Sequence, residues 1–278
     1  MNNTPVRRKI PEVVLSGEDS EVRDIIVEEE ADGMKKPAEH LRGVPRSGDD
    51  IEWGDLSRFG PVLPPGTDVL KNKPFYRFFK RFFDIVLCSL ALIVLMPFLL
   101  IIALIVFIDD PHGSPIFIQW REGKNRRKFK ILKFRSMVVN AEELLESLRK
   151  QGKTIKSPND PTYKLKDDPR MTRFGKFIRK TSIDELPQLI NVIKGDMSIV
   201  GPRPPIPREV DVYNDFALQR LLVRPGLTCI WQTTRNRDDV PFPDWMKMDV
   251  TYIQHCSFLL DCKLIFKTFA IVFSANGH

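Results

Sequence analysis

The sequence has few cysteines, and their spacing excludes two common kinds of site. None of the four stands in a C-x-x-C pair or a disulfide framework, so we expect neither a cysteine metal site nor disulfide bonds. Unpaired thiols fit a reducing, cytosolic environment. Zinc-finger spacing and aromatic RNA-binding signatures are also lacking, so we expect no nucleic acid partner. The cysteines are Cys88, Cys229, Cys256 and Cys262.

Long apolar runs are scarce too, with one exception. The mean hydropathy is −0.20, which excludes a transporter with many membrane spans. The exception is a run of 24 uncharged residues, 85–108, which is long enough to cross the hydrocarbon core of a bilayer. This run begins too far from Met1 to be a cleavable signal peptide. The sequence therefore predicts one membrane-inserted segment.

Basic residues flank this run at both ends. Arg77, Lys80 and Arg81 precede it, and seven cations between Arg121 and Lys133 follow it. Because basic residues mark the cytoplasmic side, one straight span would place one of the two groups outside. Pro97, in the middle of the run, removes a backbone donor and bends or breaks helices. Two interpretations stay open: an ordinary spanning helix, or a helix broken at Pro97 that enters and leaves the same leaflet.

Charge is distributed unevenly along the chain. Residues 1–73 hold 11 Lys+Arg and 15 Asp+Glu, whereas residues 74–278 hold 32 and 21. Residues 1–72 are also polar and rich in turn-forming residues, so we expect a disordered acidic tail. The basic remainder, attached to a membrane segment, predicts anionic lipid headgroups or phosphorylated substrates as partners.

The rest of the chain is expected to be mainly α-helical with a small β-hairpin. Interleaved aromatic and basic residues before the apolar run are typical of an interfacial helix entry. Strands are predicted at 116–120 and 128–134, and helices at 140–150, at 182–194 (stopped by Gly195) and at 257–274. Residues 151–166 and the proline-rich residues 201–207 are expected to be irregular.

Adjacent carboxylates, Asp184 and Glu185, are the sharpest local feature. Ser182, three residues before Glu185, makes the pattern of a capping box, which is the simpler explanation. In a basic domain behind a membrane segment, the same pair is suited to hold a divalent ion. A carboxylate is also a competent nucleophile toward phosphorus. The residues alone leave both explanations open.

Other charged side chains stand where they could serve a site or simply face solvent. Arg203, in the proline-rich segment, is pre-positioned to grip phosphate. Lys133 and Arg135 end the second predicted strand and offer two more cations. Asp261 is the sole carboxylate of the apolar helix at 257–274, and burying it is costly unless it is paired or bound to metal.

In their order along the chain, these features resemble the bacterial sugar transferases, or monotopic phosphoglycosyl transferases, in their small core-only form. The resemblance covers residues 80–273, about two-thirds of the chain. The matching residues are Lys80-Arg81 with Asp84, Pro97, Gly113 with Pro115, Phe117-x-Gln119-x-Arg121, Lys133-Phe134-Arg135-Ser136-Met137, Asp168-Pro169-Arg170-x-Thr172-x-x-Gly175, Thr181-Ser182-x-Asp184-Glu185-Leu186-Pro187-Gln188-Leu189, Asn191-Val192, Lys194-Gly195-Asp196-Met197-Ser198, Gly201-Pro202-Arg203-Pro204, Arg224-Pro225-Gly226-Leu227-Thr228 and Leu260-Asp261.

The resemblance implies a fold and a place in the cell. It implies a monotopic membrane protein with a re-entrant helix-break-helix at Pro97 and interfacial amphipathic helices, on the cytoplasmic face of the bacterial inner membrane. The chain would divide into the tail (1–72), a membrane-entry and re-entrant segment (73–115) and a cytosolic or interfacial catalytic domain (116–278). The oligomeric state stays open, and a homodimer is one expectation.

The resemblance also implies an activity. Asp184 would attack the β-phosphorus of a UDP-sugar and release UMP, and undecaprenyl phosphate would then take the phosphosugar, in the first step of exopolysaccharide, capsule or O-antigen assembly. Glu185 would hold Mg²⁺, with Asp261 as a further metal position. Lys133, Arg135, Arg203 and Arg224 would bind substrate phosphate or nucleotide.

Departures from the family pattern affect the expected substrate and leave the reaction unchanged. Cys229 replaces a usual glycine, Thr234-Arg235-Asn236-Arg237 replaces a Gly-Arg pair, and Glu122 replaces an aliphatic residue. We expect a hexose, galactose or glucose, as the sugar. The alternatives are a catalytically silent membrane scaffold or regulator with the same fold, and a peripheral lipid-binding protein.

Overall fold

The computed structural model describes residues 55–150, 168–234 and 240–273. All of them belong to one of the two units into which the chain divides, residues 43–278. Residues 1–54 of the predicted tail, the whole predicted loop at 151–166, and the departure at residues 235–237 lie outside the described residues.

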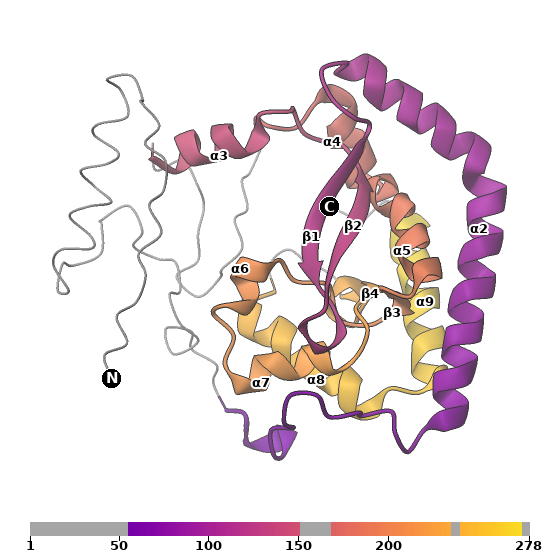
Figure 1. Ribbon diagram of the computed structural model, residues 1–278, viewed down its shortest axis with the longest axis vertical. Coiled ribbons are helices and arrows are strands. Elements are labelled where there is room, and N and C mark those ends of the chain that lie inside the picture. The colour runs from indigo at the N-terminus through magenta and orange to yellow at the C-terminus, as the bar shows by residue number, and fades with distance from the viewer. Residues whose placement is uncertain (1–54, 151–167, 235–239, 274–278) are drawn as a thin grey trace, which may run out of the picture. The chain divides into compact units, whose positions relative to one another are not determined.

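Helix α2 (Pro74–Asp109) contains the long apolar run and the aromatic entry before it. It packs against α4, α5 and β3 (Figure 1). One stripe of the helix is buried in these contacts, including Cys88, Leu99, Ile102 and Val106. The other faces are exposed and apolar, with Leu90, Ile93, Val94, Leu100 and Leu104 among the exposed side chains. By length and composition α2 could cross a membrane.

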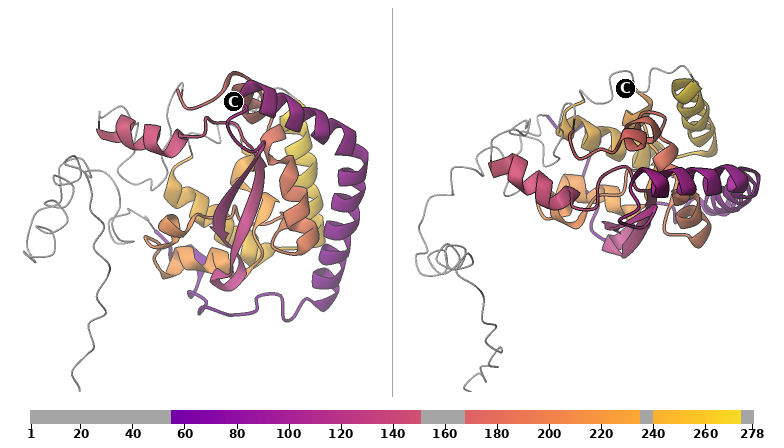
Figure 2. Two further views of the ribbon diagram at one scale, coloured as in Figure 1. Left: turned by 45° about the horizontal axis from the view of Figure 1, so that its top comes forward. Right: turned by 90° about the horizontal axis from the view of Figure 1, so that it is seen from above.

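Pro97 lies inside α2, and the helix continues through it. The prediction of a helix-break-helix is therefore corrected at the level of secondary structure, since α2 is one helix of 36 residues. Its ribbon changes direction along its length (Figures 1 and 2). A proline removes a single backbone hydrogen bond, and the bonds on either side of it preserve the helix while allowing a bend.

Strands β1 (Ile116–Glu122) and β2 (Lys128–Phe134) form the predicted hairpin, with β1 two residues longer than expected. The pairing is antiparallel, with Phe117 opposite Lys133 and Arg121 opposite Phe129. The turn contains a short 3₁₀ helix, η4 (Lys124–Arg126), in which Asn125 has a φ of 55°. Because alternate residues share a face, Phe117, Gln119, Arg121 and Lys133 lie on the same side of the hairpin.

The predicted helix at 182–194 is two elements in the structure. Residues Ile183–Gln188 form the 3₁₀ helix η5, and α5 (Leu189–Lys194) follows and ends at Gly195, whose φ is 91°. Pro187 explains the difference, because it has no N–H to complete an α-helical bond. The predicted capping box is wrong: Ser182 has a left-handed φ of 57° and makes no side-chain cap bond.

Short elements complete this region of the chain. Helix α3 (Ala141–Lys150) follows Asn140 as predicted. The next helix, α4 (Arg173–Lys180), is capped by Thr172, whose Oγ1 accepts a hydrogen bond from the Gly175 amide at 3.0 Å. Residues 201–206 are irregular, as the prolines predict. The helices that follow are α6 (Pro207–Val210), α7 (Asp215–Leu218), η6 (Gln219–Leu222), η7 (Trp231–Thr233), α8 (Phe242–His255) and α9 (Phe258–Phe273).

A second sheet, which the sequence did not predict, pairs β3 (Ser198–Val200) with β4 (Gly226–Thr228) in parallel. The backbone of Gly226, the first residue of β4, lies very close to Gly201, which follows β3. A Cβ added to Gly226 would lie 2.1 Å from the Gly201 nitrogen. No side chain fits at that distance, so glycine is required there. Helix α9, which confirms the predicted C-terminal helix, contacts both strands.

Residues 55–72, which the sequence analysis placed in the disordered tail, pack onto the folded unit. Phe59, at the end of η3 (Ser57–Phe59), lies edge-on to Phe216 with the ring centroids 5.1 Å apart. The Leu63 amide donates to Gln219 Oε1 at 3.1 Å, and Gln254 Nε2 donates to the Phe59 carbonyl at 2.6 Å. The tail boundary is corrected, because Leu56, Phe59, Val69 and Leu70 are partly buried against a core that local composition does not reveal.

Candidate active site

Asp184 and Glu185 lie on η5, which packs against β2 and α4. Asp184 is only 7% exposed, and Glu185 is half-buried beside it. From β2, Lys133 Nζ donates a hydrogen bond to Glu185 Oε1 at 2.6 Å. The structure therefore brings together three of the predicted site residues, a carboxylate pair and a cation, from two elements separated by about 50 positions in sequence.

The electrostatic environment of Asp184 suits a reactive carboxylate. Burial raises the pKa of Asp184 to about 6, Lys133 and Arg179 act to lower it, and the neighbouring charge of Glu185 raises it. The carboxyl group is therefore ionised at neutral pH but poorly solvated. A nucleophile toward phosphorus must be deprotonated, and weak solvation makes its oxygen more reactive.

Arg121 belongs to this site, although the sequence analysis assigned it no role. It is buried at the end of β1, where Nη1 donates to the Pro204 carbonyl at 2.9 Å and Nη2 donates to Gln119 Oε1 at 2.7 Å. Burial and the charge of Arg203 lower the pKa of Arg121 to about 10, and Glu185 is among the anions that raise it. Arg121 is thus within electrostatic reach of both Arg203 and Glu185. The signal in the sequence was the alternation of Gln119 and Arg121 on the hairpin face that carries Lys133.

Arg203 is half-buried on the irregular segment after β3. The next residue, Pro204, accepts a hydrogen bond from Arg121 on β1, so the segment lies beside the hairpin, and the charge of Arg203 acts to lower the pKa of Arg121. The backbone carbonyl of Arg203 accepts a hydrogen bond from Arg220 Nη2 at 2.8 Å. Arg203 is therefore carried by a segment other than those that carry Lys133 and the carboxylates.

Two further predicted phosphate ligands have other surroundings. Arg135 is buried and pairs with Asp110, directly after α2, with Nη1 3.3 Å from Asp110 Oδ2 and Nη2 donating to the Asp110 carbonyl. Arg224 is exposed, and burial of part of its side chain and the charge of Arg81 lower its pKa. Arg77 and Asp84 also act on Arg224, so it lies near the beginning of α2. Among the described contacts, no hydrogen bond or ion pair links Arg135 or Arg224 to the Lys133–Glu185 pair.

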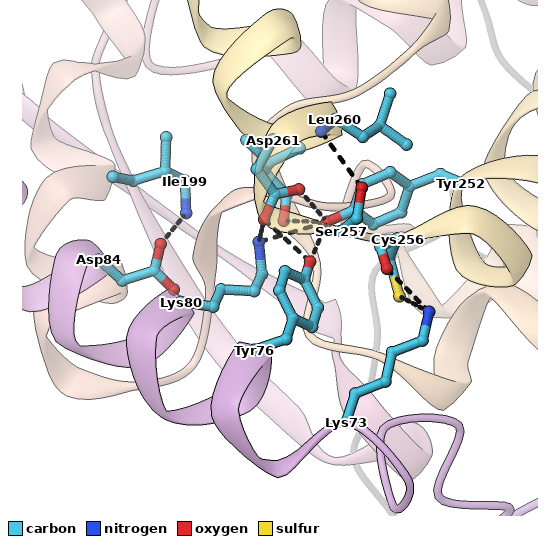
Figure 3. A network of polar contacts seen from close by, with 11 residues as sticks. Lys73, Tyr76, Lys80, Asp84, Ile199, Tyr252, Cys256, Ser257, Leu260 and Asp261 are labelled. Atoms are coloured by element: carbon cyan, nitrogen blue, oxygen red, sulfur yellow. Dashed lines mark hydrogen bonds and ion pairs between the residues drawn. The ribbon is translucent and has the colours of Figure 1, made fainter.

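Asp261 lies in a network of its own, shown in Figure 3. It is 6% exposed, and its Oδ2 accepts hydrogen bonds from Lys80 Nζ and Tyr76 Oη, both at 2.8 Å. Its Oδ1 accepts from Tyr252 Oη at 2.8 Å. These bonds connect α2, α8 and α9. Protein donors thus satisfy Asp261, and the predicted role of Asp261 as a metal ligand is not supported by its contacts.

The adjacent carboxylates fit the donor set of Mg²⁺. Mg²⁺ in phosphoryl-transfer sites is held by one or two carboxylates together with substrate phosphates, rather than by a full cage of protein ligands. Among the described residues, no group of three or more His, Cys, Asp and Glu side chains is arranged to hold a metal. Glu185 is the residue of this pair that would hold the ion, with the remaining positions taken by substrate oxygens and water.

The chain is similar in sequence to several known proteins. The chain is 40% identical over 237 residues to the UDP-galactose-lipid carrier transferase of Erwinia amylovora, covering 85% of this chain and 48% of that protein. It is 43% identical over 199 residues to the exopolysaccharide production protein ExoY of Sinorhizobium fredii (71% and 87%). The undecaprenyl-phosphate galactose phosphotransferase of Salmonella typhimurium matches at 40% identity over 201 residues (72% and 42%).

The chain therefore spans about half the length of the first and third of these relatives, and most of the second. The sequence model of the family described as bacterial sugar transferase matches residues 75–275, which include every site residue discussed above. That match covers well over half of the chain. The protein belongs to the bacterial sugar transferase family.

Proposed function

We propose that this protein transfers a sugar-1-phosphate from a UDP-sugar to undecaprenyl phosphate and releases UMP. The observation that carries the proposal is the buried Asp184 next to Glu185, with Lys133 bonded to Glu185 at 2.6 Å, in a chain of this family. The names of two relatives describe a galactose transferase to a lipid carrier and a galactose phosphotransferase to undecaprenyl phosphate. Galactose is accordingly the first sugar to test.

In the first half-reaction, a carboxylate oxygen of Asp184 attacks the β-phosphorus of the UDP-sugar. The new O–P bond forms as the bond between the β-phosphorus and the bridging oxygen breaks, and UMP leaves with that oxygen and its electron pair. A phosphosugar-aspartate remains on the enzyme. Positioning and charge neutralisation account for most of the catalysis of such transfers. In this proposal Arg203, Arg121 and Lys133 supply the positive charge.

In the second half-reaction, an oxygen of undecaprenyl phosphate attacks the same phosphorus. The aspartyl O–P bond breaks, the Asp184 carboxylate is restored, and the product is undecaprenyl-diphospho-sugar. Lys133 keeps Glu185 in place through both steps, because its ammonium is bonded to that carboxylate. A Mg²⁺ ion held by Glu185 would neutralise diphosphate charge when bound.

Access to a lipid substrate follows from α2. Its exposed apolar faces belong in lipid, and basic residues stand on both sides of it. An arrangement with both ends at the cytoplasmic face keeps these cations inside and the site near the headgroups. In this arrangement, a re-entrant α2 bent at Pro97, the lipid phosphate and the soluble nucleotide reach Asp184 from the same side of the membrane.

The experiment is UMP release in detergent with Mg²⁺ and undecaprenyl phosphate, over UDP-galactose, UDP-glucose and the two UDP-N-acetylhexosamines. Asp184→Asn is compared with Asp215→Asn, an exposed aspartate on α7. We expect release with a hexose donor, abolished by Asp184→Asn and kept by Asp215→Asn. UMP release by the Asp184→Asn variant would show that Asp184 is not the nucleophile. No release with any donor would favour the silent scaffold.

A further inference from the structure

The segment that carries Arg203 is held by its carbonyl groups. Four consecutive carbonyls accept hydrogen bonds, and two of the donors are arginine side chains. Pro202 is bonded by the Gly226 amide at 2.9 Å, Arg203 by Arg220 at 2.8 Å, Pro204 by Arg121 at 2.9 Å and Pro205 by the Glu122 amide at 2.9 Å. Prolines lack the N–H that ordinary strand pairing requires. Carbonyl acceptors are therefore the main means by which the fold can fix this segment.

Arg220, on η6, is the more deeply buried of the two arginines. It is 4% exposed, and it makes three contacts at once. Besides the Arg203 carbonyl, Nη1 donates to Tyr213 Oη at 2.5 Å, and Nη2 lies 2.7 Å from Oδ2 of Asp249, which is fully buried on α8. A guanidinium has five donors in a fixed plane, so a single Arg220 can contact a carboxylate, a phenol and a carbonyl together.

We propose that Arg220, held by Asp249 and Tyr213, is a positioning residue for Arg203. The proposal rests on the proposed function, since it assumes that Arg203 binds the diphosphate of the donor. Arg220 is buried and so does not meet the substrate itself. It acts by fixing the peptide plane at residue 203, which sets the direction in which the Arg203 side chain leaves the backbone.

The competing explanation is a purely structural one. The buried Arg220–Asp249 pair could serve only the hydrophobic core formed by α7, α8 and η7, which contains Tyr213, Phe216, Trp245 and Met246. Both explanations predict lost stability when the pair is broken. Only the positioning role predicts that the effect on substrate depends on the Arg203 side chain, so a double-mutant cycle separates them.

The test combines Arg220→Lys with Arg203→Ala and measures kcat/KM for UMP release from the best UDP-sugar. Lysine keeps the charge opposite Asp249 but lacks the fork that reaches the Arg203 carbonyl. A misplaced binding group costs up to about 10²-fold, so we expect Arg220→Lys to lower kcat/KM by about 10- to 100-fold. In the Arg203→Ala protein the same change should cost less than about 2-fold, because the group that it positions is gone.

Arg170→Lys is the matched control. Arg170 is also a buried arginine with a carboxylate partner, Asp168, at 2.7 Å, and no described contact joins it to Arg203. The fold-change in kcat/KM caused by Arg170→Lys should be the same in the wild-type protein and in the Arg203→Ala protein. The melting temperature of each variant is recorded, and Asp249→Asn provides a second way to weaken Arg220 if the lysine variant does not fold.

The same cycle is measured on UDP binding by calorimetry, which does not require turnover. If the effects of Arg220→Lys and Arg203→Ala are additive in both readouts, the positioning role is overturned and the proposed function is left intact. If the wild type releases no UMP but binds UDP, and the double-mutant cycle on UDP binding shows coupling, then the proposed reaction is overturned and the positioning role is kept. No binding of UDP would overturn both.

Discussion

Lys133 Nζ and Glu185 Oε1 lie 2.6 Å apart, and this bond connects the hairpin to the segment that carries both carboxylates. The side chains of Lys133 and Glu185 are 19% and 33% exposed, so the pair is partly shielded from water. Partly buried, charge-assisted hydrogen bonds of this length are stronger than surface ion pairs. Lys133 is therefore placed to fix Glu185 and, through its charge, to favour the ionised form of Asp184.

Replacing Lys133 by methionine should lower the rate of UMP release by about 10²-fold, the usual effect of removing one stabilising donor from such a site. Glu185 would lose its partner, and Asp184 would lose a charge that favours its carboxylate. Steady-state kinetics with the preferred UDP-sugar would measure the effect. Lys130→Met is the control, because Lys130 lies on the same strand over the Trp120 ring, 5.2 Å from its centroid. Equal losses in the two variants would contradict a specific role for Lys133.

The first half-reaction should depend on pH with an acid limb at an apparent pKa of about 6. The nucleophile must be ionised, and burial raises the pKa of Asp184 to about 6. The rate should rise as the pH increases through this value and then level off. UMP release in the absence of undecaprenyl phosphate isolates this step from the titration of the acceptor. An acid limb near 4 would show that the Asp184 carboxyl is solvated as in a free peptide.

Asp184→Asn should abolish turnover and yet stabilise the fold at neutral pH. The folded pKa of Asp184 lies above the unfolded value of 3.8, so the folded state binds the proton more tightly and loses stability as the pH rises from about 4 to about 6. A neutral asparagine avoids that loss, and the gain above pH 6 should be about 1–3 kcal/mol. Chemical denaturation at pH 4 and pH 7.5 tests the sign. A variant that is less stable at pH 7.5 would contradict it.

Asp261→Asn should destabilise the fold more than it affects the chemistry. Three donors, from Tyr76, Lys80 and Tyr252, would face an amide in place of a carboxylate, and Lys80 would lose its buried counter-charge. Breaking a buried ion pair costs about 3–5 kcal/mol, and we expect a loss near the lower end since Lys80 is partly exposed. Thermal unfolding in detergent measures the loss. Tyr252→Phe, which removes only hydrogen bonds, should cost about 1 kcal/mol. An unchanged melting temperature for Asp261→Asn would show that the network has no structural weight.

Pro97→Leu should straighten α2 and move the N-terminal tail outside the cell. Leucine restores the missing backbone donor, and a straight helix of this length spans the bilayer. The measurement is labelling of a cysteine placed at Ser47 with a membrane-impermeant maleimide on intact cells. A cysteine at Ser147, exposed on α3, should stay protected in both proteins. If Ser47→Cys is also protected in the Pro97→Leu protein, then Pro97 alone does not set the topology.

Features with a local physical cause were predictable from the sequence. The hairpin follows from alternation around a basic turn, the end of α5 from Gly195, and the irregular course of residues 201–206 from prolines that cannot donate. Each of these depends on residues close together in the chain. The carboxylate pair and Lys133 were likewise visible, although their roles came from the resemblance to a family and not from spacing.

Features that depend on distant partners were not predictable. The parallel pairing of β3 with β4 depends on a close approach of Gly201 and Gly226, which no periodicity indicates. Arg121 and Arg220 look like ordinary surface cations in the sequence, and only the fold shows that backbone carbonyls far along the chain are their partners. Arg135 and Asp261 show the converse. The sequence analysis assigned Arg135 to a substrate and Asp261 to a metal, and in the structure both side chains are paired with protein partners.

The pair of Arg135 and Asp110 has a consequence for how the enzyme fits bilayers of different thickness. Arg135 is two residues beyond Lys133 on the same chain, about 7 Å at the rise of an extended strand, and its guanidinium is fastened to the residue that follows α2. The short chain segment from Lys133 to Arg135 and the Arg135–Asp110 ion pair thus fix the distance from the end of α2 to the reacting carboxylates. In the proposed membrane-inserted state, the surrounding lipids must stretch or compress to match this fixed distance. The distance of Asp184 from the hydrocarbon core therefore stays the same in bilayers of different thickness.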